Sequence, residues 1–228
     1  MLADSHFSDS EFGLAHQYAT TGGKRFPDTY GGKRCLDIIE QVEHPQILVG
    51  VENVWNAAKP QFSVQYRNLD RIHFRLVKFD YQAWKFGNYT SPANLDAQLR
   101  KRITSLPAVK AWSVDMQPVE NFKAREQELD APLDIAVGSY LLLASSRPDF
   151  AAKDNFLKVQ HIWKSDLACV QNTSPKRDMR SGQVLHAITG KPVSGARIRV
   201  DHWVRDGRNS RMTSVSYTHL TLPTIYSV

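Results

Sequence analysis

Cysteine is scarce in this sequence, which has only Cys35 and Cys169 in 228 residues. Two distant cysteines provide neither a disulfide framework nor the paired thiols of a zinc knuckle. Cys169 stands in the apolar run Leu167-Ala-Cys-Val170. We therefore expect it to be a small buried side chain rather than a nucleophile.

Long apolar runs are missing as well. A helix needs roughly 18 consecutive apolar residues to span a membrane, and no such stretch occurs, so the sequence predicts no membrane span. The first residues, Met-Leu-Ala-Asp-Ser-His, lack the basic start and apolar core of a signal peptide.

Phosphate-binding motifs are incomplete. Gly22-Gly-Lys-Arg25 and Gly31-Gly-Lys-Arg34 lack the spaced glycines and the Lys-Ser/Thr end of a phosphate-binding loop. We interpret both as turns. At Gly190-Lys191, the following Pro192 removes an amide that such a loop would need.

Catalytic and metal-binding patterns are also absent. The histidines before residue 215 stand singly, without the i, i+4 spacing that places two metal ligands on one helix face. His73 alternates with Arg71 and Arg75 on the predicted solvent face of a strand, which argues against a buried catalytic role. We predict no catalytic residue, no metal ligand, no cofactor and no enzyme activity; no binding residue is identified.

Positive charge is in modest excess, with 29 Lys and Arg against 23 Asp and Glu and a formal net charge of +6. The basic residues form small separate groups without the interleaved aromatic residues of a nucleic-acid groove. We therefore expect no nucleic-acid partner.

Residues 1–45 have the periodicity of a helical hairpin at the end of a longer helical region. Ser8 and Glu11 have the spacing of a capping box, and Gly22-Gly23 predicts the end of the first helix. A second helix ends before Pro45, and its apolar side consists of Cys35, Ile38, Ile39 and Val42.

From residue 46 onward the apolar period changes from about 3.6 to 2. Alternation over 62–66 and 72–76 predicts a β-hairpin with one solvent face. One helix interrupts the strands, with Ser91 as N-cap, Pro92 at its first position and Pro107 beyond its end. We predict a mainly β protein whose residues 46–172 form an antiparallel β-sandwich with one inserted helix.

The predicted core of this sandwich consists of Phe62, Phe74, Leu76, Tyr140, Leu142 and Trp163. Trp55, Trp112 and Trp163 are also residues of the type that stacks on sugars. Core packing is the commoner use of tryptophan in strands, and we favour it here.

The stretch 173–178 predicts a linker, and residues 178–214 the start of a second β-sandwich that is cut short. Two strands flank a turn at Thr189-Gly-Lys-Pro192. Alternation directs Ala196, Ile198 and Val200 inward.

Residues 215–224 match, codon by codon, the translation of a transposase-derived sequencing adaptor. Val215, Tyr217, His219 and Thr221 also alternate as in a β-strand. We favour the adaptor, so we expect 215–228 to be a non-native tail that does not pack as a strand, on a fragment of a longer gene.

Several segments occur in an order that carries a family resemblance: residues 25–35, 54–56, 63–75, 138–141, 163–168 and 182–200. Together they resemble the N-terminal part of bacterial alpha-2-macroglobulin family proteins over nearly all of residues 25–204. The resemblance implies fibronectin-like antiparallel sandwiches, called macroglobulin domains, in a large cell-envelope protein at the periplasm or cell surface. It implies neighbouring macroglobulin domains as partners, and proteases as partners of the full-length protein.

Such family members are thought to trap proteases, many of them through a Cys-Gln thioester. Cys169-Val-Gln171 departs from the Cys-x-Glu-Gln pattern in spacing and context, so no thioester residue is transferred to this chain. We expect these residues to be scaffold of an endopeptidase inhibitor. The alternatives are a carbohydrate-binding or adhesive β-sandwich module of a surface protein, or a regulatory domain of an outer-membrane transporter or peptidase.

Overall fold

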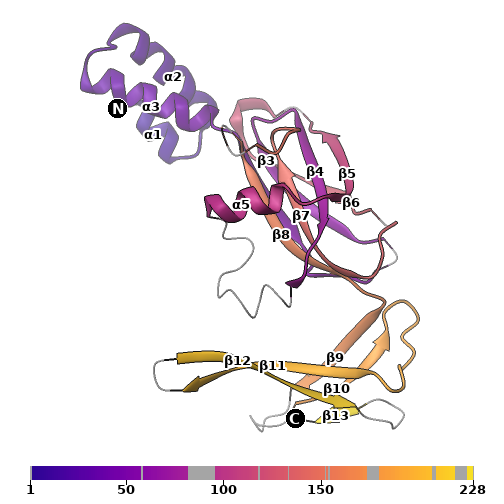
Figure 1. Cartoon of the computed structure of the whole chain (residues 1–228). Helices are drawn as coiled ribbons and strands as arrows, with labels where there is room; N and C mark the ends of the chain where they lie inside the picture. The colour runs from indigo at the N-terminus through magenta and orange to yellow at the C-terminus, as the bar shows by residue number, and fades with distance from the viewer. Residues whose placement is uncertain are drawn as a thin grey trace.

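The computed structural model describes residues 2–57, 59–81, 96–117, 119–132, 134–151, 153, 155–173, 180–206, 209–218 and 225–227. Three helices come first, a two-sheet sandwich lies in the middle, and a second β unit follows at the opposite end of the molecule (Figure 1). The prediction of a mainly β fold with helices at its N-terminal end is confirmed.

The N-terminal part is a three-helix bundle rather than a two-helix hairpin. Its helices are α1 (Leu2–Ser8), α2 (Phe12–Arg25) and α3 (Tyr30–Glu43). Small side chains dominate its core, which consists of Ala3, Ala15, Ala19, Cys35, Ile38 and Val42.

The predicted capping box at Ser8 and Glu11 is wrong. Ser8 ends α1, and Glu11 precedes α2 without a side-chain capping bond. The Glu11 carboxylate instead lies 2.6 Å from Nδ1 of His6. The side-chain cap of α3 is Thr29, whose hydroxyl accepts a hydrogen bond of 3.0 Å from the Gly32 N–H.

Both Gly-Gly-Lys-Arg segments lie inside helices, so their interpretation as turns is wrong. A Cβ atom at Gly22 would lie 2.7 Å from Sγ of Cys35, and one at Gly32 would lie 1.7 Å from the carbonyl oxygen of Phe26. Close packing therefore requires glycine at these positions, although glycine is a poor helix former.

The sandwich has a three-stranded sheet in the order β1-β3-β6 and a five-stranded sheet in the order β2-β8-β7-β4-β5. The strands are β1 (Gln46–Val51), β2 (Val54–Trp55), β3 (Gln61–Arg67), β4 (Arg71–Lys78), β5 (Ala108–Asp115), β6 (Arg125–Asp130), β7 (Gly138–Ser145) and β8 (Leu157–Lys164). A 3-10 turn, η1 (Glu120–Phe122), lies between β5 and β6. Every pairing in these two sheets is antiparallel except that of β2 with β8.

The two sheets enclose an aromatic core. Ring contacts run from Trp55 through Phe62 and Phe74 to Trp112, with centroid distances of 6.2, 5.5 and 5.3 Å. Five of the six predicted core residues are buried, namely Phe62, Phe74, Leu76, Tyr140 and Leu142. Alternation identified the buried face of the β3–β4 hairpin correctly, and the apolar run around Leu141 correctly predicted burial on both sides of β7.

Trp163 is the exception, and its assignment to the core is wrong. Its neighbour Ile162 is fully buried between the sheets. Because successive side chains of a strand point to opposite faces, Trp163 lies on the outer face of the five-stranded sheet, where it is partly exposed.

Helix α5 (Ala97–Thr104) covers another part of this outer face (Figure 1). Leu99 and Ile103 pack in one cluster with Leu141 of β7. The Asp96 side chain caps the helix by accepting a hydrogen bond of 2.7 Å from the Leu99 N–H. The predicted cap at Ser91-Pro92 lies outside the described residues, and the described helix begins after Asp96.

The second β unit contains a sheet of β9 (Leu167–Thr173), β10 (Arg180–His186) and β13 (Ile225–Ser227), and a hairpin of β11 (Arg197–Asp206) and β12 (Asn209–Thr218). Strand β9 pairs with β10 and not with β8, so the first sandwich ends at Lys164 rather than at the predicted residue 172. Ala196 and Ile198 are partly buried between exposed arginines, as the alternation predicted, and the side chain of Val200, the third residue of that prediction, lies outside the described part.

The expectation that residues 215–228 do not pack as a strand is wrong for the described part of that segment. Val215 pairs with Val200, and Thr218 pairs with Arg197, within β12 and β11. Residues 225–227 form β13 beside β10. Pairing depends on backbone hydrogen bonds and on β-compatible residues, whatever the origin of the segment.

Candidate functional site

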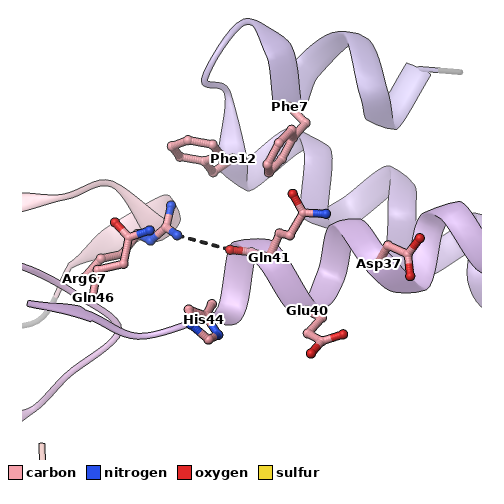
Figure 2. Close-up of a pocket in the computed structure, with 8 residues that line it drawn as sticks. All are labelled: Phe7, Phe12, Asp37, Glu40, Gln41, His44, Gln46 and Arg67. Atoms are coloured by element: carbon pink, nitrogen blue, oxygen red, sulfur yellow. Dashed lines mark hydrogen bonds between the residues drawn. The ribbon is translucent and has the colours of Figure 1, made fainter. Parts of the chain in front are cut away.

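A pocket of about 580 Å³ lies where the helical bundle meets the sandwich (Figure 2). We call it the junction pocket. Its volume falls in the range of small-ligand sites. It is lined by Phe7, Phe12, Asp37, Glu40, Gln41, His44, Gln46 and Arg67.

Arg67 and Asn68 bind the C-terminal end of α3 beside this pocket. Nη2 of Arg67 donates a hydrogen bond of 3.1 Å to the Gln41 carbonyl, and Nδ2 of Asn68 donates one of 2.7 Å to the Val42 carbonyl. The last carbonyls of a helix lack intrahelical partners and carry partial negative charge. The turn between β3 and β4 thereby fixes the bundle to the sandwich.

Arg67 is itself buried, with 6% of its surface exposed. Its guanidinium carbon lies 5.1 Å from the centroid of the Phe12 ring. Its Nε atom has no hydrogen-bond acceptor among the described residues. Burial lowers the pKa of Arg67, because the charged form loses hydration.

The junction pocket offers both polar and apolar contacts to a ligand. Gln41, His44, Gln46 and Arg67 can form hydrogen bonds, and Phe7 and Phe12 supply apolar surface. No sequence pattern marked this site, since its residues come from five separate segments that only the fold brings together.

A second group of side chains lies on the outer face of the five-stranded sheet. The His161 ring stacks on Tyr81 at 4.3 Å and meets Trp163 edge-on at 5.2 Å. Nε2 of His161 lies 2.9 Å from Oγ of Ser139. Sequence analysis missed this Ser–His contact, because the two residues meet only through the pairing of β7 with β8.

Among the described residues, the Ser139–His161 contact has no third group that would complete a catalytic triad. In the part of the chain that the structure describes, no carboxylate forms an ion pair with His161 to orient its second nitrogen. Burial lowers the pKa of His161 to about 4, so this imidazole is a weak base at neutral pH.

Lowering the pH should destabilise the fold through His161. The folded-state pKa of about 4 lies below the unfolded value of 6.5, so the unfolded chain binds more protons between these values. The contribution of His161 is complete above pH about 6.5 and is lost as the pH falls toward 4. Urea unfolding at several pH values should show a shallower pH slope for His161→Gln than for wild type. An unchanged slope would contradict this assignment, and His186→Gln in the second β unit serves as the control.

The two cysteines and His73, which the sequence analysis discussed, lie outside both the junction pocket and the Ser139–His161 group. Cys35 is buried in the helical bundle, whereas Cys169 is exposed, so its expected burial is wrong. On β9, Leu167 and Val170 are also exposed, and alternation along the strand places Leu167 on the same face as Cys169 and Val170 on the opposite face. His73 is partly buried, and its pKa is lowered by burial and by Arg71 and Arg75.

The described ranges contain no group of three His, Cys, Asp or Glu side chains that could hold a metal ion. None of the described helices combines the length and the apolar character needed to cross a bilayer.

No protein-family model matches the chain, and no curated protein matches it in sequence. Solved structures of bacterial alpha-2-macroglobulin are similar in fold. Native alpha-2-macroglobulin from Escherichia coli, spanning domains NIE-MG1, is 14% identical, with a TM-score of 0.48 over 80% of this chain and 86% of that one. A longer piece of the same protein, spanning MG0-NIE-MG1, is 12% identical, with a TM-score of 0.44 over 80% of this chain and 61% of that one.

A Salmonella alpha-2-macroglobulin mutant is 10% identical, with a TM-score of 0.32 over 82% of this chain and 14% of that one. This chain therefore spans only a small part of the longest of these proteins. The likeness concerns architecture, and it carries no argument about activity or partners.

Proposed function

We propose that this chain is a structural scaffold in a cell-envelope endopeptidase inhibitor of the alpha-2-macroglobulin type. In this proposal the inhibitory chemistry lies elsewhere in the parent protein, and residues 2–218 transmit mechanical force between domains. The family assignment is supported by the sequence segments that resemble this family and occur in the same order along the chain. The mechanical role is supported by the way the helical bundle, the sandwich and the second β unit are joined.

The observation that carries the proposal is that the central sandwich is tied at both ends. At one end, Arg67 and Asn68 hold the carbonyls of α3. At the other end only Ser165 and Asp166 separate β8 from β9. The Asp166 carbonyl accepts a hydrogen bond of 2.8 Å from the Ala187 N–H of the second β unit. Short, hydrogen-bonded connections suit a scaffold that moves as connected rigid parts.

The isolated chain should neither inhibit proteases nor show catalytic activity of its own. Incubated with trypsin, chymotrypsin or elastase, it should leave cleavage of a large protein substrate unchanged and should form no adduct that survives denaturing electrophoresis. The physical reason is that covalent trapping needs an activated acyl group. Stoichiometric protection of the substrate by this chain would overturn the proposal. As a positive control, the parent protein expressed from its uninterrupted reading frame should inhibit in the same assay.

A carbohydrate-binding module is the second candidate, and the outward position of Trp163 beside Tyr81 favours it. Aromatic faces on an outer sheet surface are suited to stacking against sugar rings. Retention of the chain on immobilised cell-wall glycan, lost in Trp163→Ala and kept in the buried-core variant Leu142→Met, would favour this candidate over the scaffold.

A further inference from the structure

Within the described structure, the guanidinium of Arg67 is a buried cation without a carboxylate partner. No Asp or Glu of the described residues forms an ion pair with it. Burial of an unpaired charge is unfavourable, because the charge loses hydration without gaining a counter-charge. The C-terminal end of α3 offsets part of this cost with its partial negative charge.

Among the described residues, the hydrogen-bonding capacity of Arg67 is only partly used. A guanidinium has five N–H groups. One of them donates to the Gln41 carbonyl, and Nε has no acceptor among the described residues. A planar group with parallel donors matches a carboxylate in shape and charge.

The surroundings of Arg67 favour a ligand with one negative charge and an apolar part. The rings of Phe7 and Phe12 meet edge-on at 5.6 Å on the same side of α3 as Gln41 (Figure 2). Asp37 and Glu40 also line the pocket, with carboxylates that point away from the guanidinium (Figure 2). Their charges disfavour a ligand with two negative charges, such as a phosphate monoester.

We propose that the junction pocket binds the C-terminal carboxylate of a peptide whose last residue is apolar or aromatic. The carboxylate pairs with the guanidinium of Arg67, and the side chain packs on Phe7 and Phe12. The side-chain amides of Gln41 and Gln46 line the same pocket and can donate to the carboxylate or to the preceding carbonyl. This site is independent of the scaffold role and would remain if that role were disproved.

The test compares two probes that differ only in charge, N-acetyl-L-phenylalanine and N-acetyl-L-phenylalaninamide. Each is titrated into the full chain and followed by amide and arginine Nε–H chemical shifts. We expect a dissociation constant of about 1 mM for the acid. The amide should bind at least about tenfold more weakly, because the charge-assisted hydrogen bonds are lost. Binding of the acid should weaken with added salt. Equal affinities for acid and amide, or tighter binding of phenyl phosphate, would overturn the proposal.

Variants separate the roles of charge and aromatic surface. Arg67→Met should abolish the preference for acid over amide. Because Arg67 also holds the Gln41 carbonyl, each variant is checked by circular dichroism. Phe12→Leu keeps the guanidinium and its bond to Gln41. It should therefore weaken the binding of both probes equally and preserve the ratio of their affinities. Arg71→Gln is the matched control, since the exposed Arg71 pairs with Asp115 away from the pocket and should leave both affinities unchanged. A preference that persists in Arg67→Met would place the anion elsewhere.

Discussion

Replacing Trp55 with alanine should lower the free energy of unfolding of the sandwich by about 3 to 5 kcal/mol. Trp55 is fully buried and stacks on Phe62 with a centroid distance of 6.2 Å. It begins the row of aromatic contacts that crosses the core, so its removal leaves a large cavity between the sheets. Chemical denaturation followed by circular dichroism measures the change.

Two further tryptophan variants make this prediction specific. Trp55→Phe should cost less, about 1.5 kcal/mol or under, since it keeps an aromatic ring in the core and removes a buried indole N–H that has no acceptor among the described residues. Trp163→Ala should also cost clearly less than Trp55→Ala, because Trp163 is partly exposed on the outer face. If Trp163→Ala were the more harmful change, the register of β8 described above would be wrong.

Replacing Gly32 with alanine should destabilise the helical bundle by about 3 kcal/mol or more. A Cβ atom at this position would overlap the carbonyl oxygen of Phe26 at 1.7 Å. Since the obstacle is backbone rather than a flexible side chain, the start of α3 must move, and the bond from the Gly32 N–H to the Thr29 hydroxyl is lost with it. Thermal unfolding followed at 222 nm reports the loss of helix.

The control for this change is the adjacent helical residue. Gly31→Ala should be neutral or slightly stabilising, because alanine favours the helix over glycine by about 1 kcal/mol. Equal destabilisation by both variants would show that the first turn of α3 tolerates no side chain at all, and would remove the specific role of the Phe26 contact.

The sequence by itself determined which residues face the core in those elements that have one buried face and one solvent-exposed face. Phe62, Phe74 and Leu76 were assigned to the core by alternation alone, and Cys35, Ile38 and Val42 by helical spacing. Burial of one face requires the period of the element, so the pattern is visible without any knowledge of the partner. The mainly β class and the helical start follow from the same signal.

Only the tertiary structure decided the features that depend on contacts between distant segments. Gly22 and Gly32 suggest turns when taken locally, but Cys35 and Phe26 approach them so closely that glycine is required within helices. Ile162, and not Trp163 as predicted, faces the core, because the register of β8 against β7 sets which residue faces inward. Arg67 has no local pattern at all, and it became a buried cation because α3 ends above it. Periodicity describes the environment of one element, whereas these properties arise from which elements meet.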